Sequence, residues 1–296
     1  MKKIFALAIA ALFITNAAFA DGDDDTDKKV RFGLKITPTP TWLRSGDTKL
    51  VDKSGVKFGF GFGLQLEFRL GNTAAFVTGI GGDFLGGKQT YKNGQGLVLT
   101  SDGKYVKSAD HDFGDIPLVM ASTQTLTTNN KIYEIKSRTV KTTYVTIPVL
   151  LKLKTKDINH MKYFGMFGGN VAIQTKYQAT EELSELNYNT TTGKYESGAT
   201  TNFSSMKPSG DLIPFNIALN VGLGFEYNLS GSTSFFMSAN YIRGFFNTYQ
   251  GTSDYLVEKI KDNINSNTPT NYGNKPDRAK QSAFSDGVQI NLGFLF

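Results

Sequence analysis

The sequence contains no cysteine, which excludes both a disulfide scaffold and a lipoprotein anchored through a cysteine. Histidine occurs only twice among 296 residues. The CxxC, HExxH, P-loop and GxSxG motifs are also missing, and the glycine-rich FGFGFG stretch precedes no helix that could cradle a phosphate. The sequence therefore predicts neither an enzyme nor a bound cofactor or metal.

Long apolar runs are missing beyond the first 20 residues, so no helix is expected to cross a membrane. The first 20 residues have a lysine pair at the start, an apolar run from Ile4 to Ile14, and the small-residue motif Ala18-Phe19-Ala20. This pattern predicts a secretory signal peptide over residues 1–20, because the apolar run is too short for a membrane anchor. Residues 21–29 are acidic and are expected to form a disordered lead-in.

Strong charge of one sign is missing as well. The formal net charge of +6 falls to +4 once the two lysines of residues 1–20 are removed, and the charges are spread along the chain. Nothing in this distribution indicates a nucleic-acid partner.

What the sequence does contain is alternation, clearest in residues 56–70, VKFGFGFGLQLEFRL. Even positions are apolar and odd positions are small or polar. A strand points successive side chains to opposite faces, so this stretch predicts a strand with one apolar and one polar face. Fifteen residues exceed the usual length of a soluble strand, about 5–6 residues, and suit a strand that crosses a lipid bilayer.

Seven further segments alternate in the same way, and together they predict eight strands over residues 30–296. Short turns follow the second, fourth and sixth strands, and long polar loops follow the third, fifth and seventh. An antiparallel barrel with short periplasmic turns and long surface loops has this asymmetry. The expected strands are 30–42, 56–70, 74–87, 139–154, 162–177, 212–228, 233–249 and 282–296, and the expected long loops are 88–138, 178–211 and 250–280.

The sequence thus predicts an all-β fold, a single eight-stranded antiparallel up-and-down transmembrane β-barrel with long extracellular loops. The alternative is a soluble lipocalin-like periplasmic ligand carrier, which would turn the apolar faces inward. Two aromatic girdles favour the membrane barrel. The girdle residues are Tyr163, Tyr227 and Phe294 near the turn ends, and Trp42, Tyr177 and Tyr249 near the outer ends.

Several positions predict local irregularities. Pro148 cannot donate a ladder hydrogen bond, which predicts a bulge or gap in its strand. Arg243 falls on an apolar face and must reach the membrane interface or be turned by a bulge. Short helices are expected at Glu181–Leu186 and where Leu256, Ile260 and Ile264 recur every four residues.

The polar faces would line a lumen narrow enough for side chains to fill it. We expect its buried carboxylates to pair with basic residues. This lumen polar network comprises Arg31, Lys35, Glu67, Arg69, Lys152 and Glu226. A filled polar plug is favoured over a selective solute path, since little space would remain.

The closing stretch GVQINLGFLF resembles the C-terminal assembly signal of bacterial outer-membrane barrels, which the barrel-insertion machinery reads. The signal residues are Val288, Ile290, Leu292, Phe294 and Phe296. Together with YVTIPVLLKLK at 144–154, and Ile147–Lys152 within it, the sequence resembles the PorT-like outer-membrane β-barrel family of Bacteroidetes. The resemblance implies an eight-stranded outer-membrane barrel, and some members of that family belong to protein-secretion machinery.

Three functions remain open. The first is a structural or binding role through the surface loops, where binding residues on a rigid scaffold usually lie. The second is a narrow pore or an accessory of a secretion complex. The third is a hydrolase at the barrel rim using His111 between Asp110 and Asp112, a pattern more often found on solvated surface. Expected partners are outer-membrane lipid, lipopolysaccharide, the insertion machinery and a surface or secretion-complex protein.

Overall fold

The computed structural model describes residues 29–46, 49–92, 96–101, 104–105, 130–189, 191, 194–206, 213–249, 251–258 and 278–296. The predicted signal peptide, nearly all of the acidic lead-in and the Asp110–Asp112 stretch lie outside these residues. No helix in the described part of the chain is long and apolar enough to cross a membrane.

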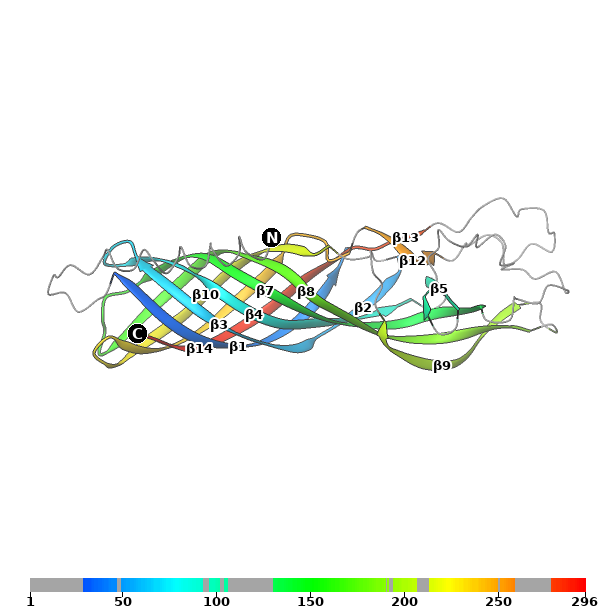
Figure 1. Ribbon diagram of the computed structural model, residues 1–296, viewed down its shortest axis with the longest axis horizontal. Coiled ribbons are helices and arrows are strands. Elements are labelled where there is room, and N and C mark those ends of the chain that lie inside the picture. Colours follow the sequence, from blue (N-terminus) through cyan, green and yellow to red (C-terminus); the bar gives the residue numbers. More distant parts are fainter. Residues whose placement is uncertain are drawn as a thin grey trace, which may run out of the picture.

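The described residues form one antiparallel sheet (Figure 1). Its strands are β1 Val30–Ser45, β2 Val51–Gly55, β3 Lys57–Arg69, β4 Ala74–Tyr91, β5 Gly96–Ser101, β6 Lys104–Tyr105, β7 Asn130–Lys154, β8 Met161–Asn189, β9 Lys194–Met206, β10 Phe215–Ser230, β11 Thr233–Gly244, β12 Thr252–Glu258, β13 Arg278–Lys280 and β14 Ala283–Leu295.

Eight of these strands close into a ring. Following hydrogen-bonded neighbours, the order is β1, β3, β4, β7, β8, β10, β11, β14 and back to β1. Each neighbour in the ring precedes or follows the next along the chain, and all pairs are antiparallel. The predicted eight-stranded up-and-down barrel is therefore confirmed.

The apolar side chains of the ring point outward. Along β3, Phe60, Phe62 and Leu64 are 46–54% exposed, whereas Gln65 and Glu67 are at most 5% exposed. A lipocalin-like carrier would bury the apolar set and expose the polar one. The observed orientation suits a barrel whose outer wall meets lipid, and the lipocalin-like alternative is wrong.

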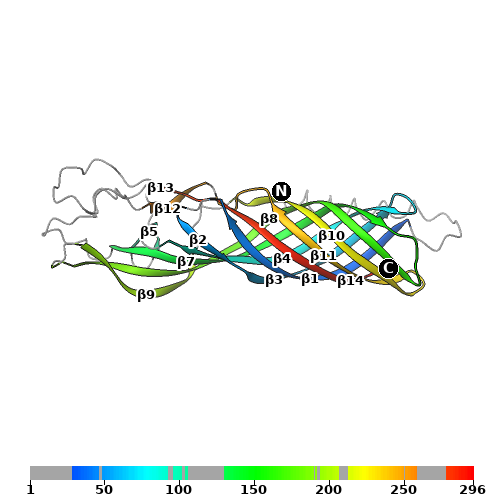
Figure 2. The same ribbon diagram turned by 180° about the vertical axis from the view of Figure 1, so that it is seen from behind.

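Two strands continue far beyond the ring. β7 has 25 residues and β8 has 29, against the roughly 9–11 tilted residues that cross a bilayer. Their far parts pair with each other, β5 and β12 join them on the β7 side, and β9 joins β8 (Figures 1 and 2). We call this part, with β13, the extension. It leaves the barrel at the end opposite the short turns.

The extension corrects the prediction of polar loops at 88–138 and 178–211, because much of each forms strands. Residues Glu181–Leu186, expected as a helical turn, lie in β8. Leu256, expected in a helix, lies in strand β12, whereas Ile260 and Ile264 lie outside the described residues. The four-residue repeat that begins at Leu256 was misleading, because pairing with β5 makes this residue part of a strand. Pairing with β7 does the same for residues 181–185.

The predicted irregularity at Pro148 is confirmed as a gap. Pairing between β4 and β7 stops after Val77 and Leu150 and resumes at Gly81 and Thr146 in the same register. The interruption faces Pro148, which has no N–H to donate. On its other side β7 keeps its pairing with β8 through this point, where Pro148 lies opposite Asn170.

Candidate functional site

The lumen near the turn end holds a buried cluster of charges, which we call the ion cluster. It comprises Arg31 on β1, Glu67 on β3, Lys152 and Lys154 on β7, and Glu226 on β10. Inward alternation on four strands brings these side chains together from positions up to 195 residues apart.

Lys152 is the centre of the ion cluster. Its Nζ donates to Glu67 Oε2 at 2.7 Å and also to Glu226, and its side chain has no exposed surface. Glu226 Oε2 lies 2.8 Å from Arg31 Nη1, and Lys154 contacts Glu67. Each carboxylate thus faces at least two cations, which is what buried charges require.

The other two predicted network residues lie elsewhere. Arg69 hydrogen-bonds to Gly71 O and to Asn72 Oδ1 at 3.0 Å, in the turn between β3 and β4. Lys35 is farther along the lumen, where its electrostatic partner is Asp83. The structure therefore brings together Arg31, Glu67, Lys152 and Glu226 from the predicted set, and adds Lys154.

Apolar side chains fill the space beside the ion cluster. Phe164 and Phe236 point inward, and Lys152 Nζ lies 4.2 Å from the centroid of the Phe164 ring, a cation–π contact. The packed residues are Val77, Leu150, Phe164, Met166, Phe236 and Leu295. The sequence analysis did not predict this inward apolar cluster, although Phe164 and Phe236 alternate with the outward Tyr163 and Phe235.

A chain of amides crosses the next level of the lumen. Asn220 donates to Asn170 at 3.0 Å, Asn240 donates to Asn220 at 2.7 Å, and Asn291 donates to Asn240 at 3.1 Å. Thr37 of β1 donates to Asn291 at 3.0 Å. These bonds link five neighbouring strands, and the side chains satisfy one another's hydrogen-bonding groups inside the lumen.

The junction of barrel and extension is closed by a second buried charge pair. Arg138 and Glu181 contact each other and have no exposed side-chain surface. Tyr249 stacks near Arg138, with its ring centroid 5.9 Å from Cζ, and donates to Gln89 at 3.1 Å. The sequence prediction missed this pair because it placed both residues in loops.

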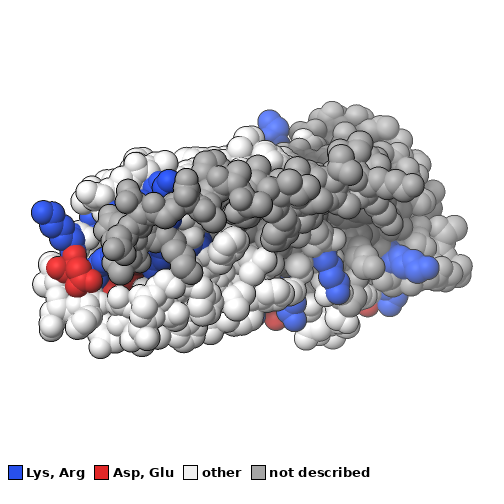
Figure 3. Space-filling model, turned by 60° about the vertical axis from the view of Figure 1, so that its left-hand side comes forward, with Lys and Arg blue, Asp and Glu red and all other residues white. Residues whose placement is uncertain are grey.

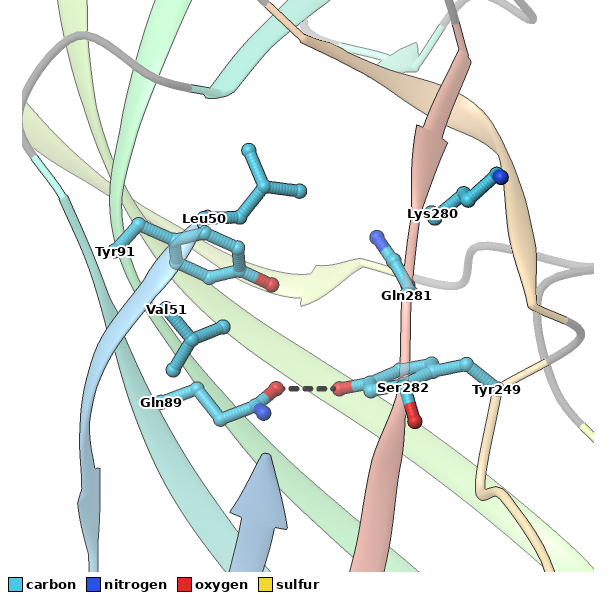
Figure 4. Close-up of a pocket in the computed structure, with 8 residues that line it drawn as sticks. All are labelled: Leu50, Val51, Gln89, Tyr91, Tyr249, Lys280, Gln281 and Ser282. Carbon is cyan, nitrogen blue, oxygen red and sulfur yellow. Dashed lines mark hydrogen bonds between the residues drawn. The ribbon is translucent and has the colours of Figure 1, made fainter. Parts of the chain in front are cut away.

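A small cavity lies beside this junction (Figure 4). Its volume is about 10 Å³, room for roughly one water molecule. Gln281 turns its amide toward this space, and Gln89 and Tyr249 meet at its floor. The cavity is too small for an organic ligand. Its lining residues are Leu50, Val51, Gln89, Tyr91, Tyr249, Lys280, Gln281 and Ser282.

The predicted girdle residues divide into two groups. Tyr163, Tyr227 and Phe294, near the turn end, are 43–48% exposed, and Trp42 is half-buried. Tyr177 and Tyr249 were expected to face outward, and this is wrong, because both pack in a core with Leu43, Val140 and Ala283.

The inward orientation of each of these two tyrosines has a local cause. The β7–β8 ladder pairs Thr143 with Lys176 and Tyr144 with Gln174, so one residue of β8 is skipped and the facing of Tyr177 changes. Tyr249 lies beyond the end of β11, which stops at Gly244, so the alternation no longer applies. Exposed aromatic rings at the outer end come instead from residues such as Phe215 and Phe246, in edge-to-face contact at 5.8 Å.

The remaining predicted residues lie on the surface. Phe294 and Phe296 are exposed at the end of β14, and Val288, Ile290 and Leu292 on the same face are half-buried. Arg243 is exposed one residue before the outer end of β11, a position from which it can reach the membrane interface. His160 lies in the β7–β8 turn with φ 65°, and its N–H donates to Asp157. Within the described ranges no cluster of His, Cys, Asp and Glu could hold a metal ion.

The extension has its own electrostatic contacts. Ser137 donates to Glu182 across the β7–β8 pair, and Lys88 lies 3.6 Å from the same carboxylate. The Ser137 hydrogen bond, opposed by partial burial and aided by Lys88, lowers the pKa of Glu182 below its ordinary value. Lys131 pairs with Glu185 nearby at 3.0 Å, and this contact raises the pKa of Lys131.

A closed eight-stranded ring with an apolar outer wall, a filled lumen and strands that continue past one end defines the class of outer-membrane β-barrels. The profile of the outer membrane protein beta-barrel domain family matches residues 19–250, and the chain belongs to this family. It is therefore an outer-membrane protein. No curated protein matches the sequence.

Solved outer-membrane barrels resemble the chain weakly. OprG from Pseudomonas aeruginosa is 12% identical, with a TM-score of 0.38, covering 92% of this chain and 99% of that one. Neisserial surface protein A is 7% identical, with a TM-score of 0.32 and coverages of 88% and 95%. Ail, the attachment invasion locus protein of Yersinia pestis, is 11% identical, with a TM-score of 0.29 and coverages of 91% and 100%.

Proposed function

We propose that this protein is a non-enzymatic outer-membrane scaffold that holds its extension outside the cell as a binding platform. The observation that carries the proposal is the continuation of β7 and β8 from the barrel wall into a sheet with its own apolar core. That core comprises Val98, Tyr133, Ile135, Leu183, Leu256 and Ala279 of the extension, together with Leu50 just before β2 and Tyr91 at the end of β4. A rigid sheet anchored in the membrane holds its surface in a fixed orientation, as a binding platform requires.

The filled lumen argues against the pore hypothesis. The ion cluster and the apolar cluster around Phe164 lie side by side in the barrel, and the asparagine chain fills a further part of the lumen. Eight-stranded barrels are just wide enough for side chains to fill them. We therefore expect no steady conductance from the purified protein in planar lipid bilayers. Discrete single-channel steps that change on Glu67→Gln would instead support the pore.

The binding role is tested by shortening the extension without touching the barrel. Leu183 of β8 lies opposite Thr201 of β9, so residues 184–200 can be replaced by Asn-Gly, a pair that favours a two-residue hairpin turn. Cells displaying the full chain are expected to attach to surfaces coated with extracellular protein or polysaccharide, and cells displaying the shortened chain are not.

Two controls show whether a loss of attachment comes from the missing residues or from a barrel that no longer folds. Both proteins must migrate faster on gels when unheated, as closed barrels do, and Gly71→Ala in a short turn serves as a variant with full attachment. Attachment that persists in the shortened, folded variant would contradict the proposal.

Membership of the PorT-like subgroup, and with it a place beside a protein-secretion complex, is the second candidate. Ile147–Lys152, which carries the resemblance, lies in the barrel wall within β7, so it supports barrel architecture rather than secretion. The observation that favours a secretion accessory is the extension itself, which suits contact with a neighbouring membrane protein. Co-purification that depends on residues 184–200 would distinguish this candidate from attachment to an external surface.

A further inference from the structure

We propose that Arg44 and Arg243, on the outward face of the barrel wall, bind a phosphate group of lipopolysaccharide in the outer leaflet of the membrane. The site is on the wall and not on the extension, so this inference goes beyond the proposed function and does not depend on it. Three neighbouring strands build the site, with Arg44 on β1, Asp286 on β14 and Arg243 on β11 (Figure 2).

The three charged side chains share the face of the wall that meets lipid. Trp42 and Arg44 of β1 alternate with Leu43, which packs in an inward core. Trp42 lies opposite Asp286 in the β1–β14 ladder, and Asp286 lies opposite Arg243 in the β11–β14 ladder. Because paired residues of neighbouring strands share a face, Arg44, Asp286 and Arg243 all point outward.

These charges lie where the apolar band of the wall ends. On β14, Asp286 precedes the exposed Phe294 at the turn end by eight residues. At about 3.4 Å per residue and a strand tilt of roughly 40°, the two lie about 21 Å apart along the barrel axis. The apolar band of outer-membrane barrels is about 25 Å tall, and aromatic residues such as Trp42 mark its edges. On the face that Figure 3 shows, the described wall is largely uncharged, and the charged side chains lie toward its two ends.

Arg44 is held in place on several sides. Its Nε donates to Asp286 Oδ2 at 2.8 Å, its Nη2 lies 3.5 Å from Gly244 O, and its Cζ lies 4.7 Å from the centroid of the Phe284 ring. The other Asp286 oxygen accepts the backbone N–H of Gly244 at 3.2 Å. The Arg44 side chain is nevertheless 38% exposed, whereas that of Asp286 is 2% exposed. The guanidinium is thus fixed in position with one part open to a ligand, and such preorganisation favours binding.

Arg243 adds a cation that no carboxylate of the described residues neutralises. Its side chain is exposed and forms no hydrogen bond or ion pair with another residue that the structure describes. Although Asp286 lies opposite Arg243, both oxygens of that carboxylate are already engaged by Arg44 and Gly244. Two guanidinium groups therefore share one carboxylate, and the site has one positive charge in excess.

The phosphate of an outer-leaflet lipid matches this site in chemistry and in height. Guanidinium groups bind phosphate oxygens through paired N–H donors. The site lies at the end of the wall opposite the short turns, which in outer-membrane barrels is the end in the outer leaflet. Lipid A, the membrane anchor of lipopolysaccharide, carries its phosphates on sugars directly above its acyl chains. Phe245, exposed two residues beyond Arg243, offers apolar surface to those chains.

Native mass spectrometry of the protein purified in nonionic detergent tests the proposal, with lipid A and dephosphorylated lipid A as probes. Arg243→Gln removes one positive charge without breaking a side-chain contact among the described residues. The matched control is Lys141→Gln, because Lys141 is an exposed cation on the outward face of β7, which two strands separate from β11 and two from β1. We expect Arg243→Gln to weaken the binding of lipid A about tenfold and Lys141→Gln no more than about twofold. Dephosphorylated lipid A should bind all three proteins equally weakly.

Both variants must keep the faster migration of the unheated barrel. Should Arg243→Gln lose it, Arg243→Lys carries the test, because a lysine keeps the charge but not the paired donors, and weakening of about threefold is expected. Unchanged binding in the tested Arg243 variant, or equal weakening by Lys141→Gln, would overturn the proposal. Equal binding of the two forms of lipid A would show that no phosphate is recognised. Displacement of lipid A by an equal concentration of phosphatidylglycerol would assign the site to phospholipid instead, and the proposal would again be wrong.

Discussion

Arg31 and Glu226 are joined by a hydrogen bond of 2.8 Å between Nη1 and Oε2, although 195 residues separate them in the sequence. Arg31 lies at the start of the first ring strand and Glu226 near the turn end of β10. Through Lys152, which contacts Glu226 and Glu67, the same cluster reaches β7 and β3. Side-chain ion pairs across the lumen thus connect four strands of the ring, in addition to the backbone hydrogen bonds between neighbouring strands.

Removing the central cation is therefore expected to destabilise the barrel. Lys152→Met leaves Glu67 and Glu226 buried with fewer cations, and breaking a buried pair in this way costs about 3–5 kcal/mol. The midpoint of urea unfolding in detergent micelles measures the change. The double variant Lys152→Met with Glu226→Gln should recover part of the loss, because one of the stranded charges is also removed. If the double variant lost as much stability as Lys152→Met and Glu226→Gln lose separately and added together, the two residues would not be coupled.

Gly168 of β8 occupies a position that only glycine suits. Its φ is 155°, and an added Cβ would lie 2.2 Å from the carbonyl oxygen of Val149 on β7. Gly168→Ala should cost about 1–3 kcal/mol through backbone strain and this clash. Gly71 in the β3–β4 turn is the control, because an added Cβ there meets nothing within 4 Å. Equal unfolding midpoints for the two alanine variants would show that β8 relaxes without cost.

Alternation along the chain was sufficient to predict the ring, because a strand with lipid on one side and a lumen on the other must alternate. It also placed Arg31, Glu67, Lys152 and Glu226 inside. It failed at Tyr177, where a bulge changes the facing, and in the extension, where strands such as β9 are polar on both faces. Pairing there is decided by contacts distant in sequence, such as β5 with β12, and single segments do not show these.

The apolar core of the extension predicts a local form of instability. Leu183 has no exposed surface and packs with Ile135 and Leu256, so Leu183→Ala should cost about 2–5 kcal/mol. Because the barrel has a separate core, we expect proteolysis of the extension to accelerate while the unheated gel shift persists. Leu229, which is exposed near the turn end of β10, provides the matched leucine control. Loss of the gel shift in Leu183→Ala would mean that barrel and extension unfold together.

The Ser137–Glu182 contact makes pairing in the extension sensitive to acid. Its hydrogen bond lowers the pKa of Glu182, so the folded carboxyl binds a proton less readily than the unfolded one. The stabilisation is fully present above the unfolded pKa, about 4.5, and is lost as pH falls through the lowered folded value. Ser137→Ala should move the Glu182 pKa back toward its ordinary value, as measured by carboxyl carbon NMR. Glu185, whose partner is Lys131, is the internal control, and an unchanged Glu182 titration would show that Ser137 contributes nothing to it.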